Sequence, residues 1–241
     1  MFAVKFKKLS VGLVAAALLL PGLAVAETVT QTQASQAAMT PTEALQLLKE
    51  GHQRFADGEM LERDLHAQIK ATASGQYPFG VVLGCVDSRV PVEMVFDQGI
   101  GDIFVPRVAG NYVETDLLGS MEFATGVAGS KVVVVLGHSA CGAVKGAIDF
   151  VELANLTHTL SNIAPAVYSV KGFEDDRTSG NKAFVDAVVE ANVKMGVQNI
   201  YDRSPVMRGL IEEGKLIVVG AVYDLETGTI NWLDEAGHAG R

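Results

Sequence analysis

The chain has 241 residues, of which 49% are hydrophobic and 20% are charged, so disorder over most of its length is excluded. Its 19 basic and 28 acidic residues give a formal net charge of -9, which disfavours a nucleic-acid-binding protein because such proteins need a basic surface. Two cysteines are too few for a scaffold held by disulfides, and the length suits one compact domain.

Residues 1–26 have the three parts of a secretory signal peptide. Lys5, Lys7 and Lys8 give a positive start, an apolar run follows, and the small residues of Ala24-Val25-Ala26 allow cleavage. The apolar run is shorter than the ~20 residues that span a bilayer, so we expect a cleaved signal and no stable membrane anchor. The predicted location is the periplasm, where the two cysteines persist if they are paired, buried or bound to metal.

After the cut, the chain is predicted to begin with a flexible leader and to continue as a single domain over 40–241. Residues 27–39 are polar or small and show no hydrophobic pattern. Thr40, Pro41 and Glu43 are typical of a helix start, because threonine caps, proline suits the first turn and glutamate completes a capping box. This helix is predicted to end near residue 58.

The rest of the chain alternates predicted strands with predicted helices. Apolar runs predict strands at 79–84, 103–108, 131–136 and 216–223, and a turn then predicts a hairpin partner at 229–233. Helices are predicted at 116–128 and 143–153, with two more separated by the polar loop 171–181. Because most strands are continuous β-branched runs, both faces of the sheet should be covered. The predicted fold class is α/β, with a mostly parallel central sheet flanked by helices and an antiparallel edge hairpin.

Both cysteines and one histidine lie where predicted strands end. Cys85 follows the first strand, whereas His138 and Cys141 follow the strand at 131–136. In open α/β sheets ligands bind outside the carboxyl ends of strands, so two adjacent parallel strands would bring the three side chains together. Two thiolates and one imidazole form a zinc set with one position left open. The spacing also fits a Cys85–Cys141 disulfide, or two inert buried thiols with His138 as a structural hydrogen-bonding residue.

An acid and a base come shortly after the first cysteine. Asp87 stands two residues after Cys85, and Arg89 stands two residues further on. Next to a metal, Asp87 can be a fourth ligand or can accept a hydrogen bond from metal-bound hydroxide, and Arg89 can hold that carboxylate by a two-pronged hydrogen bond. The alternative is an exposed ion pair in an ordinary turn.

The pattern Cys-x-Asp-x-Arg, followed by Gly-His-Ser-x-Cys-Gly, resembles the β-class carbonic anhydrases. The matching stretches are GCVDSRVPVEMVFDQGIGDIFVPRVAGN and VVVVLGHSACGAVKGA, and the resemblance extends to VGAVYDLETG. It implies a zinc enzyme for the reversible hydration of carbon dioxide to bicarbonate and a proton. Cys85, His138 and Cys141 match the ligands of one Zn²⁺ per chain, and Asp87 and Arg89 match the catalytic pair.

The resemblance also implies substrate-binding residues and partners. Gln76 matches a glutamine that orients carbon dioxide or bicarbonate, and Gly142 matches a glycine whose backbone N–H approaches the zinc-bound oxygen. Phe104 and Ala109 match apolar positions of the pocket. The family forms homodimers or tetramers whose neighbouring subunits share the pocket, and amino-terminal helices wrap the partner subunit.

Two positions depart from the family pattern. Phe123 stands where a tyrosine is frequent, so a hydroxyl is missing near the pocket. Val82 stands where a regulated branch has a tryptophan in an inhibitory bicarbonate pocket; although Arg107 matches that branch's arginine, we expect the pocket to be absent or weak. Two alternative functions stay open: a zinc hydrolase of carbon disulfide or carbonyl sulfide, and a non-catalytic zinc-binding protein on the same fold.

Overall fold

The computed structural model describes residues 30–233, so the predicted signal peptide at 1–26 lies outside the described residues. Within 30–233, every helix is too short or too polar to cross a membrane.

The core is one five-stranded sheet in the order β2-β1-β3-β4-β5. Its strands are β1 (Gly80–Gly84), β2 (Ile103–Phe104), β3 (Val132–His138), β4 (Ile217–Tyr223) and β5 (Ile230–Trp232).

The strand pairing confirms the predicted fold class. β1 pairs parallel with β2 and β3, β3 pairs parallel with β4, and β5 runs antiparallel to β4 at one edge. The strand predicted at 103–108 is shorter in the structure, where Arg107 makes only an isolated bridge to Gly84 beyond the end of β2. Pro106 has no backbone N–H, so it cannot donate to a continued ladder.

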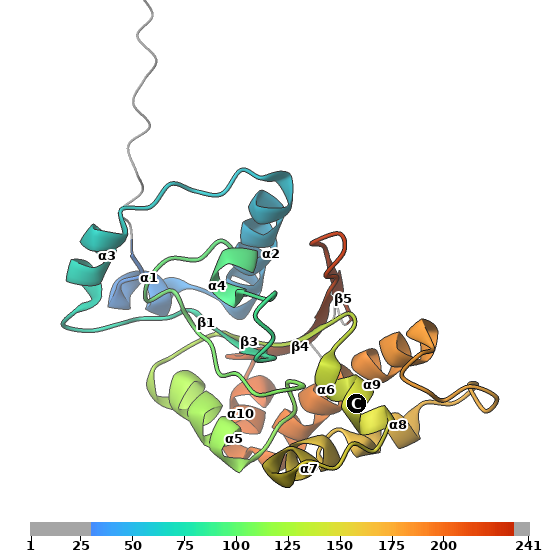
Figure 1. Cartoon of the computed structure of the whole chain (residues 1–241). Coiled ribbons are helices and arrows are strands. Elements are labelled where there is room, and N and C mark those ends of the chain that lie inside the picture. Colours follow the sequence, from blue (N-terminus) through green and yellow to red (C-terminus); the bar gives the residue numbers. More distant parts are fainter. Residues whose placement is uncertain (1–29, 234–241) are drawn as a thin grey trace, which may run out of the picture.

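Helices cover both faces of the sheet (Figure 1). They are α1 (Gln33–Ala38), α2 (Pro41–Asp57), α3 (Leu65–Thr72), α4 (Val92–Val95), α5 (Thr115–Glu122), the π-helix η1 (Phe123–Val127), α6 (Gly142–Ile148), α7 (Ala154–Ser161), α8 (Ala164–Ser169), α9 (Lys182–Arg203) and α10 (Pro205–Glu212). In Figure 1, α2 and α4 lie above the sheet, whereas α5, α9 and α10 lie below it.

Side chains of the central strand β3 alternate between these two helical layers. Val132, Val134 and Leu136 pack with residues of α2 and α4, whereas Val133 and Val135 pack with residues of α5, α9 and α10. Burying one such side chain stabilises the fold by ~1.5–3 kcal/mol. Because β3 is buried on both faces, its ends are fixed in position. The residues that directly follow the strand are therefore held in place as well.

Helix α2 begins as the sequence predicts. The Thr40 hydroxyl accepts the backbone N–H of Glu43, and the Glu43 carboxylate accepts the backbone N–H of Thr40. Gly58 ends the helix with a φ of 73°. Within the helix, Gly51 allows a close approach to the chain after α4, because a Cβ there would lie 2.0 Å from the Phe96 carbonyl oxygen.

The prediction of a flexible leader is wrong for residues 33–38, which form α1. Thr32 and Ser35 make a reciprocal capping box at its start. The Gln36 side chain is buried, and its Nε2 donates to the carbonyl oxygens of Pro78 at 2.7 Å and Ala128 at 2.8 Å. The Gln36 amide connects α1 to two segments that are distant in the sequence. A polar residue adds nothing to a hydrophobic pattern, so the sequence did not predict this helix.

Two helices have different bounds from those predicted. The segment 116–128 is α5 followed by a π-helical turn, and it ends at Gly129 with a φ of 86°. The segment 143–153 is helical only to the end of α6, since Phe150 takes a φ of 54° that no helix continues through.

Two helices were predicted around the loop 171–181, one on each side. In the described part of the chain there are four, two on each side. α7 and α8 precede the loop, and α9 and α10 follow it. Pro165 and Pro205 each stand in the first turn of a new helix, where the missing N–H costs nothing. These prolines split what the apolar pattern presents as continuous helices.

Candidate metal centre

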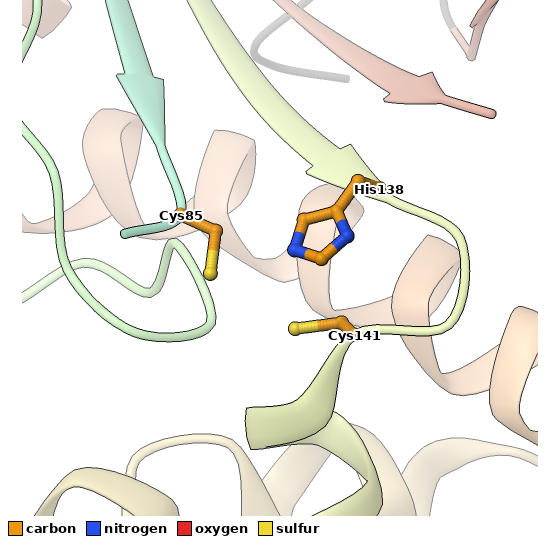
Figure 2. Close-up of side chains that lie close together, drawn as sticks. All are labelled: Cys85, His138 and Cys141. Carbon is orange, nitrogen blue, oxygen red and sulfur yellow. The ribbon is translucent and has the colours of Figure 1, made fainter. Parts of the chain in front are cut away.

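Three side chains that can bind a metal meet at the carboxyl ends of β1 and β3. The register pairs Gly84 with Leu136, so Cys85 follows β1 at the level of Gly137, one residue before β3 ends at His138. Cys141 is the N-cap residue of α6. The sulfur atoms and a ring nitrogen all lie within 4.8 Å of one another, and Figure 2 shows the three side chains pointing toward a common centre. The predicted juxtaposition is confirmed.

The ring of His138 is oriented for binding through Nε2. Its Nδ1 lies 3.0 Å from the Ser139 carbonyl oxygen, and because a carbonyl only accepts, Nδ1 carries the proton. The Nε2 lone pair is then left buried without a hydrogen-bond partner. An unpaired polar atom in this position is costly unless something binds it. The donor set therefore fits a cation at Nε2.

The two cysteines are free, buried thiols. Their mutual hydrogen bond lowers the pKa of Cys85, and the same contact raises the pKa of Cys141. Gly110 also donates its backbone N–H to the Cys85 Sγ at 3.3 Å. Two sulfurs and one imidazole nitrogen match the ligand preference of zinc, and three protein ligands leave a fourth position for water or substrate.

Asp87 and Arg89 form the predicted two-pronged pair beside the cluster. Arg89 donates from Nε to Oδ1 of Asp87 at 2.9 Å and from Nη2 to Oδ2 at 2.7 Å. The same Oδ2 lies 3.8 Å from Nε2 of His138. The hydrogen bonds from the Arg89 side chain hold the pKa of Asp87 well below its usual range. The carboxylate is therefore ionised and can only accept hydrogen bonds. The side chain of Arg89 is 57% exposed, whereas that of Asp87 is 16% exposed.

Gly142 begins α6 directly after Cys141. Its position is exposed, and a Cβ there would meet no atom within 4 Å. The packing of this chain therefore does not require glycine at this point. Its backbone N–H lies in the first turn, where a helix offers no internal acceptor.

The predicted apolar residues do not line the cluster itself. Phe104 and Phe123 meet edge to face with ring centroids 6.1 Å apart. With Val81 and Pro106 they line a separate open groove of about 610 Å³ between β2 and the helices α5 and η1. Ala109 is half-buried and is not part of that groove.

Gln76 lies at the other end of the sheet from the cluster. Its exposed side chain precedes β1, whereas Cys85 follows β1. A strand rises ~3.3 Å per residue, so five residues of β1 separate its start from Cys85 by about 16 Å. The structure therefore does not bring Gln76 to the metal ligands of its own chain.

The sequence pattern missed two contacts of the centre. The Ser139 carbonyl that orients His138 is a backbone atom, and no residue type marks it. Arg107 donates from Nε to the Cys85 carbonyl oxygen and from Nη2 to the Asp87 carbonyl oxygen, both at 2.7 Å. Arg107 lies within the matching stretch and matches an arginine of the regulated branch, but that match did not predict its hydrogen bonds to these two carbonyls.

Comparison with known proteins agrees with this geometry. The family model described as carbonic anhydrase matches residues 80–230. Carbonic anhydrase 2 of Mycobacterium tuberculosis is 35% identical over 206 residues, which cover 83% of this chain and 96% of that protein. The β-carbonic anhydrase of Coccomyxa in complex with acetazolamide has a TM-score of 0.63 at 25% identity, covering 78% of this chain and 84% of that one.

A second solved structure has the same fold. It is one of two tetrameric β-carbonic anhydrases of Sordaria macrospora, with a TM-score of 0.60 at 27% identity, covering 68% of this chain and 85% of that one. The β-carbonic anhydrases are zinc enzymes, and the Cys85, His138 and Cys141 cluster supplies a donor set of the kind zinc takes. The family match spans most of the described sheet and contains all three of these residues, so the chain belongs to the carbonic anhydrase family, in its β class.

Proposed function

We propose that this chain catalyses the reversible hydration of carbon dioxide to bicarbonate and a proton. The observation that carries the proposal is the ionised Asp87, which Arg89 holds with one carboxylate oxygen 3.8 Å from the free ring nitrogen of His138. A site that only stored zinc would not need an oriented acceptor next to the ligands. The relatives named as carbonic anhydrases support the same reaction.

The zinc ion would be held by the sulfurs of Cys85 and Cys141 and by Nε2 of His138. When bound, zinc lowers the pKa of a water molecule so that hydroxide is available near neutral pH, a chemistry for which the three-histidine carbonic anhydrases are the standard example. The chain's part is to present both sulfurs and Nε2 of His138 to the metal. The Ser139 carbonyl sets the ring's tautomer, because it accepts the hydrogen of Nδ1 and leaves Nε2 free to bind.

Asp87 orients the attacking group. Its carboxylate accepts a hydrogen bond and cannot donate one, so the hydrogen of the attacking oxygen points at Asp87 and a lone pair points at the substrate. Arg89 keeps the carboxylate ionised and turned toward the centre. The backbone N–H of Gly142 lies in the first turn of α6 without an acceptor inside the helix, and it is proposed to donate to a substrate oxygen.

The groove combines an aromatic wall with polar residues. Phe104 and Phe123 form the wall, and Thr115, Asp116 and Ser120 also line the groove. The aromatic wall suits a substrate without charge. We propose that carbon dioxide reaches the centre along this wall and past Ala109. Carbon disulfide and carbonyl sulfide remain the competing substrates, and a stopped-flow assay of the zinc-loaded protein on all three compounds decides between them.

We expect an assembly of at least two subunits. Gln76 cannot serve the metal centre of its own chain, so its proposed role in orienting the substrate requires a neighbouring copy. The tetrameric β-carbonic anhydrase of Sordaria macrospora supports assembly. Here α2 packs on β3 and β4 of its own chain, and the wrapping of a partner by the amino-terminal helices stays a prediction.

Sedimentation velocity at assay concentration should show a dimer or tetramer and no active monomer. Gln76→Ala should lower kcat/KM, since an amide that orients the substrate is lost, and should leave the zinc content unchanged. The exposed Gln198 in α9, whose side chain hydrogen-bonds with Asp202 of the same helix, provides the matched control Gln198→Ala. A fully active monomer contradicts a shared pocket.

We also propose that the protein is exported to the periplasm. The support is the sequence of residues 1–26, with its basic start, apolar run and small residues before residue 27. Amino-terminal sequencing of the protein from a periplasmic fraction should begin at Glu27. A cytoplasmic protein that keeps its first residues contradicts export.

A further inference from the structure

The segment 106–110 lies along the chain that carries the first metal ligand. Gly84, the last residue of β1, donates its backbone N–H to the Pro106 carbonyl oxygen at 3.0 Å. The Gly84 carbonyl oxygen in turn accepts the N–H of Val108 at 3.1 Å. The N–H of Gly110 reaches the Cys85 Sγ at 3.3 Å. These contacts hold the chain up to Cys85, but they do not reach Asp87.

Arg107 extends this hold into the turn that carries Asp87. Its Nε donates to the Cys85 carbonyl oxygen and its Nη2 donates to the Asp87 carbonyl oxygen, each at 2.7 Å. Hydrogen bonds from a charged donor are shorter and stronger than those between neutral groups. Because the guanidinium is planar and rigid, two bonds from one group fix the spacing of the two carbonyls.

The two carbonyls belong to the residues whose positions matter most to the proposed chemistry. Beyond Gly84, β1 has ended and no ladder holds the chain. The Asp87 carbonyl also accepts the N–H of Val90 at 3.1 Å, which closes the turn locally without tying it to the sheet. Arg107, which is half-buried, supplies that tie.

We propose that Arg107 is a positioning residue that holds Cys85 as a metal ligand and Asp87 at its place beside His138. It touches neither the metal ligand atoms nor the substrate, and it acts only through the two backbone carbonyls. The part that concerns Asp87 rests on the proposed function, whereas the part that concerns Cys85 does not. Without the guanidinium, the turn can move independently of β1, and both the sulfur and the carboxylate move with it.

The test compares Arg107→Met, Arg107→Lys and a matched control. Arg177 is the control because it also donates to two backbone carbonyls, that of Val170 at the end of α8 at 2.9 Å and that of Val167 within α8 at 2.6 Å. For each zinc-loaded variant three quantities are measured: the rate of zinc transfer to a chromogenic chelator, kcat and KM for carbon dioxide hydration, and the midpoint of thermal unfolding.

Arg107→Met should release zinc about tenfold faster or more and should lower kcat about 10- to 100-fold, with a smaller change in KM. Arg107→Lys should recover part of both losses, since an ammonium can reach one carbonyl but not both. Arg177→Met should lower the unfolding midpoint and leave zinc release and kcat unchanged. In an Asp87→Asn background, Arg107→Met should lower kcat little further, because both changes disturb the same group.

Arg107 is merely structural if Arg107→Met lowers only the unfolding midpoint, as Arg177→Met does. If Arg107→Met does not fold, Arg107→Lys provides the test. The proposal is overturned if Arg107→Lys releases zinc at the wild-type rate and has the wild-type kcat. An equal loss of kcat in the wild-type and Asp87→Asn backgrounds overturns the action through Asp87. If the wild-type protein binds zinc but does not hydrate carbon dioxide, the proposed function fails, and the zinc release rates still decide whether Arg107 holds Cys85.

Discussion

Replacing Asp87 with asparagine should lower kcat/KM for carbon dioxide hydration by about 100-fold or more while zinc stays bound. The side chain keeps its shape, but an amide can present an N–H where the carboxylate could only accept. A donor in that place turns the attacking oxygen's hydrogen away and misdirects its lone pair. Arg89 also loses the charged partner that fixes its guanidinium.

The measurement is a stopped-flow hydration assay with the zinc content of each sample determined alongside. Asp186 offers the control, because it too is a carboxylate paired with a basic side chain, Lys182, at 2.7 Å, on the surface of α9. Asp186→Asn should keep full activity, since an exposed pair of this kind contributes little to stability. An Asp87→Asn protein with full zinc and the wild-type rate would remove Asp87 from the mechanism.

The cluster of side chains that can bind a metal was predictable because two short-range features coincide. The residue types of Cys85, His138 and Cys141 restrict the chemistry, and each follows a strand whose apolar run is plain in the sequence. Parallel strands then bring their carboxyl ends to one edge of the sheet, as the pairing of β1 with β3 shows. The pairing of Asp87 with Arg89 was predictable for a similar reason, because two residues of spacing leave little freedom to the turn.

The contacts that refine the centre were not predictable from the same pattern. The hold of Arg107 on two carbonyls depends on how the segment after β2 lies along β1, which is a long-range property. The Ser139 carbonyl orients His138 through a backbone atom that any residue would supply. Gln36 is polar, so hydrophobic periodicity predicted that it belongs to a flexible leader. In the structure its side chain is buried, and its two hydrogen bonds anchor α1. In each case a hydrogen bond between distant segments decides the structure, and the sequence carries no local sign of it.

Replacing His138 with alanine should remove most of the zinc, from about one ion per chain in the wild-type protein to less than about 0.1. Two sulfurs alone would remain, and a protein site with two ligands does not hold zinc against a mild chelator. The deleted ring is the one that leaves a buried nitrogen without a partner, so its removal costs the fold no hydrogen bond at Nε2. Metal analysis after gel filtration gives the content.

His52 separates the loss of a ligand from the loss of a buried imidazole. Its ring is also buried, and its Nδ1 also lies near a backbone carbonyl oxygen, that of Val95 at 3.1 Å. Burial lowers the pKa of His52, which favours the neutral form of this ring. His52→Ala should therefore lower the unfolding midpoint while keeping its zinc. Full zinc in the His138→Ala protein would show that His138 is not a required ligand. A metal-free wild-type protein with Cys85 bonded to Cys141 would show that the two cysteines form a disulfide in place of a metal site. Either result would contradict the assignment.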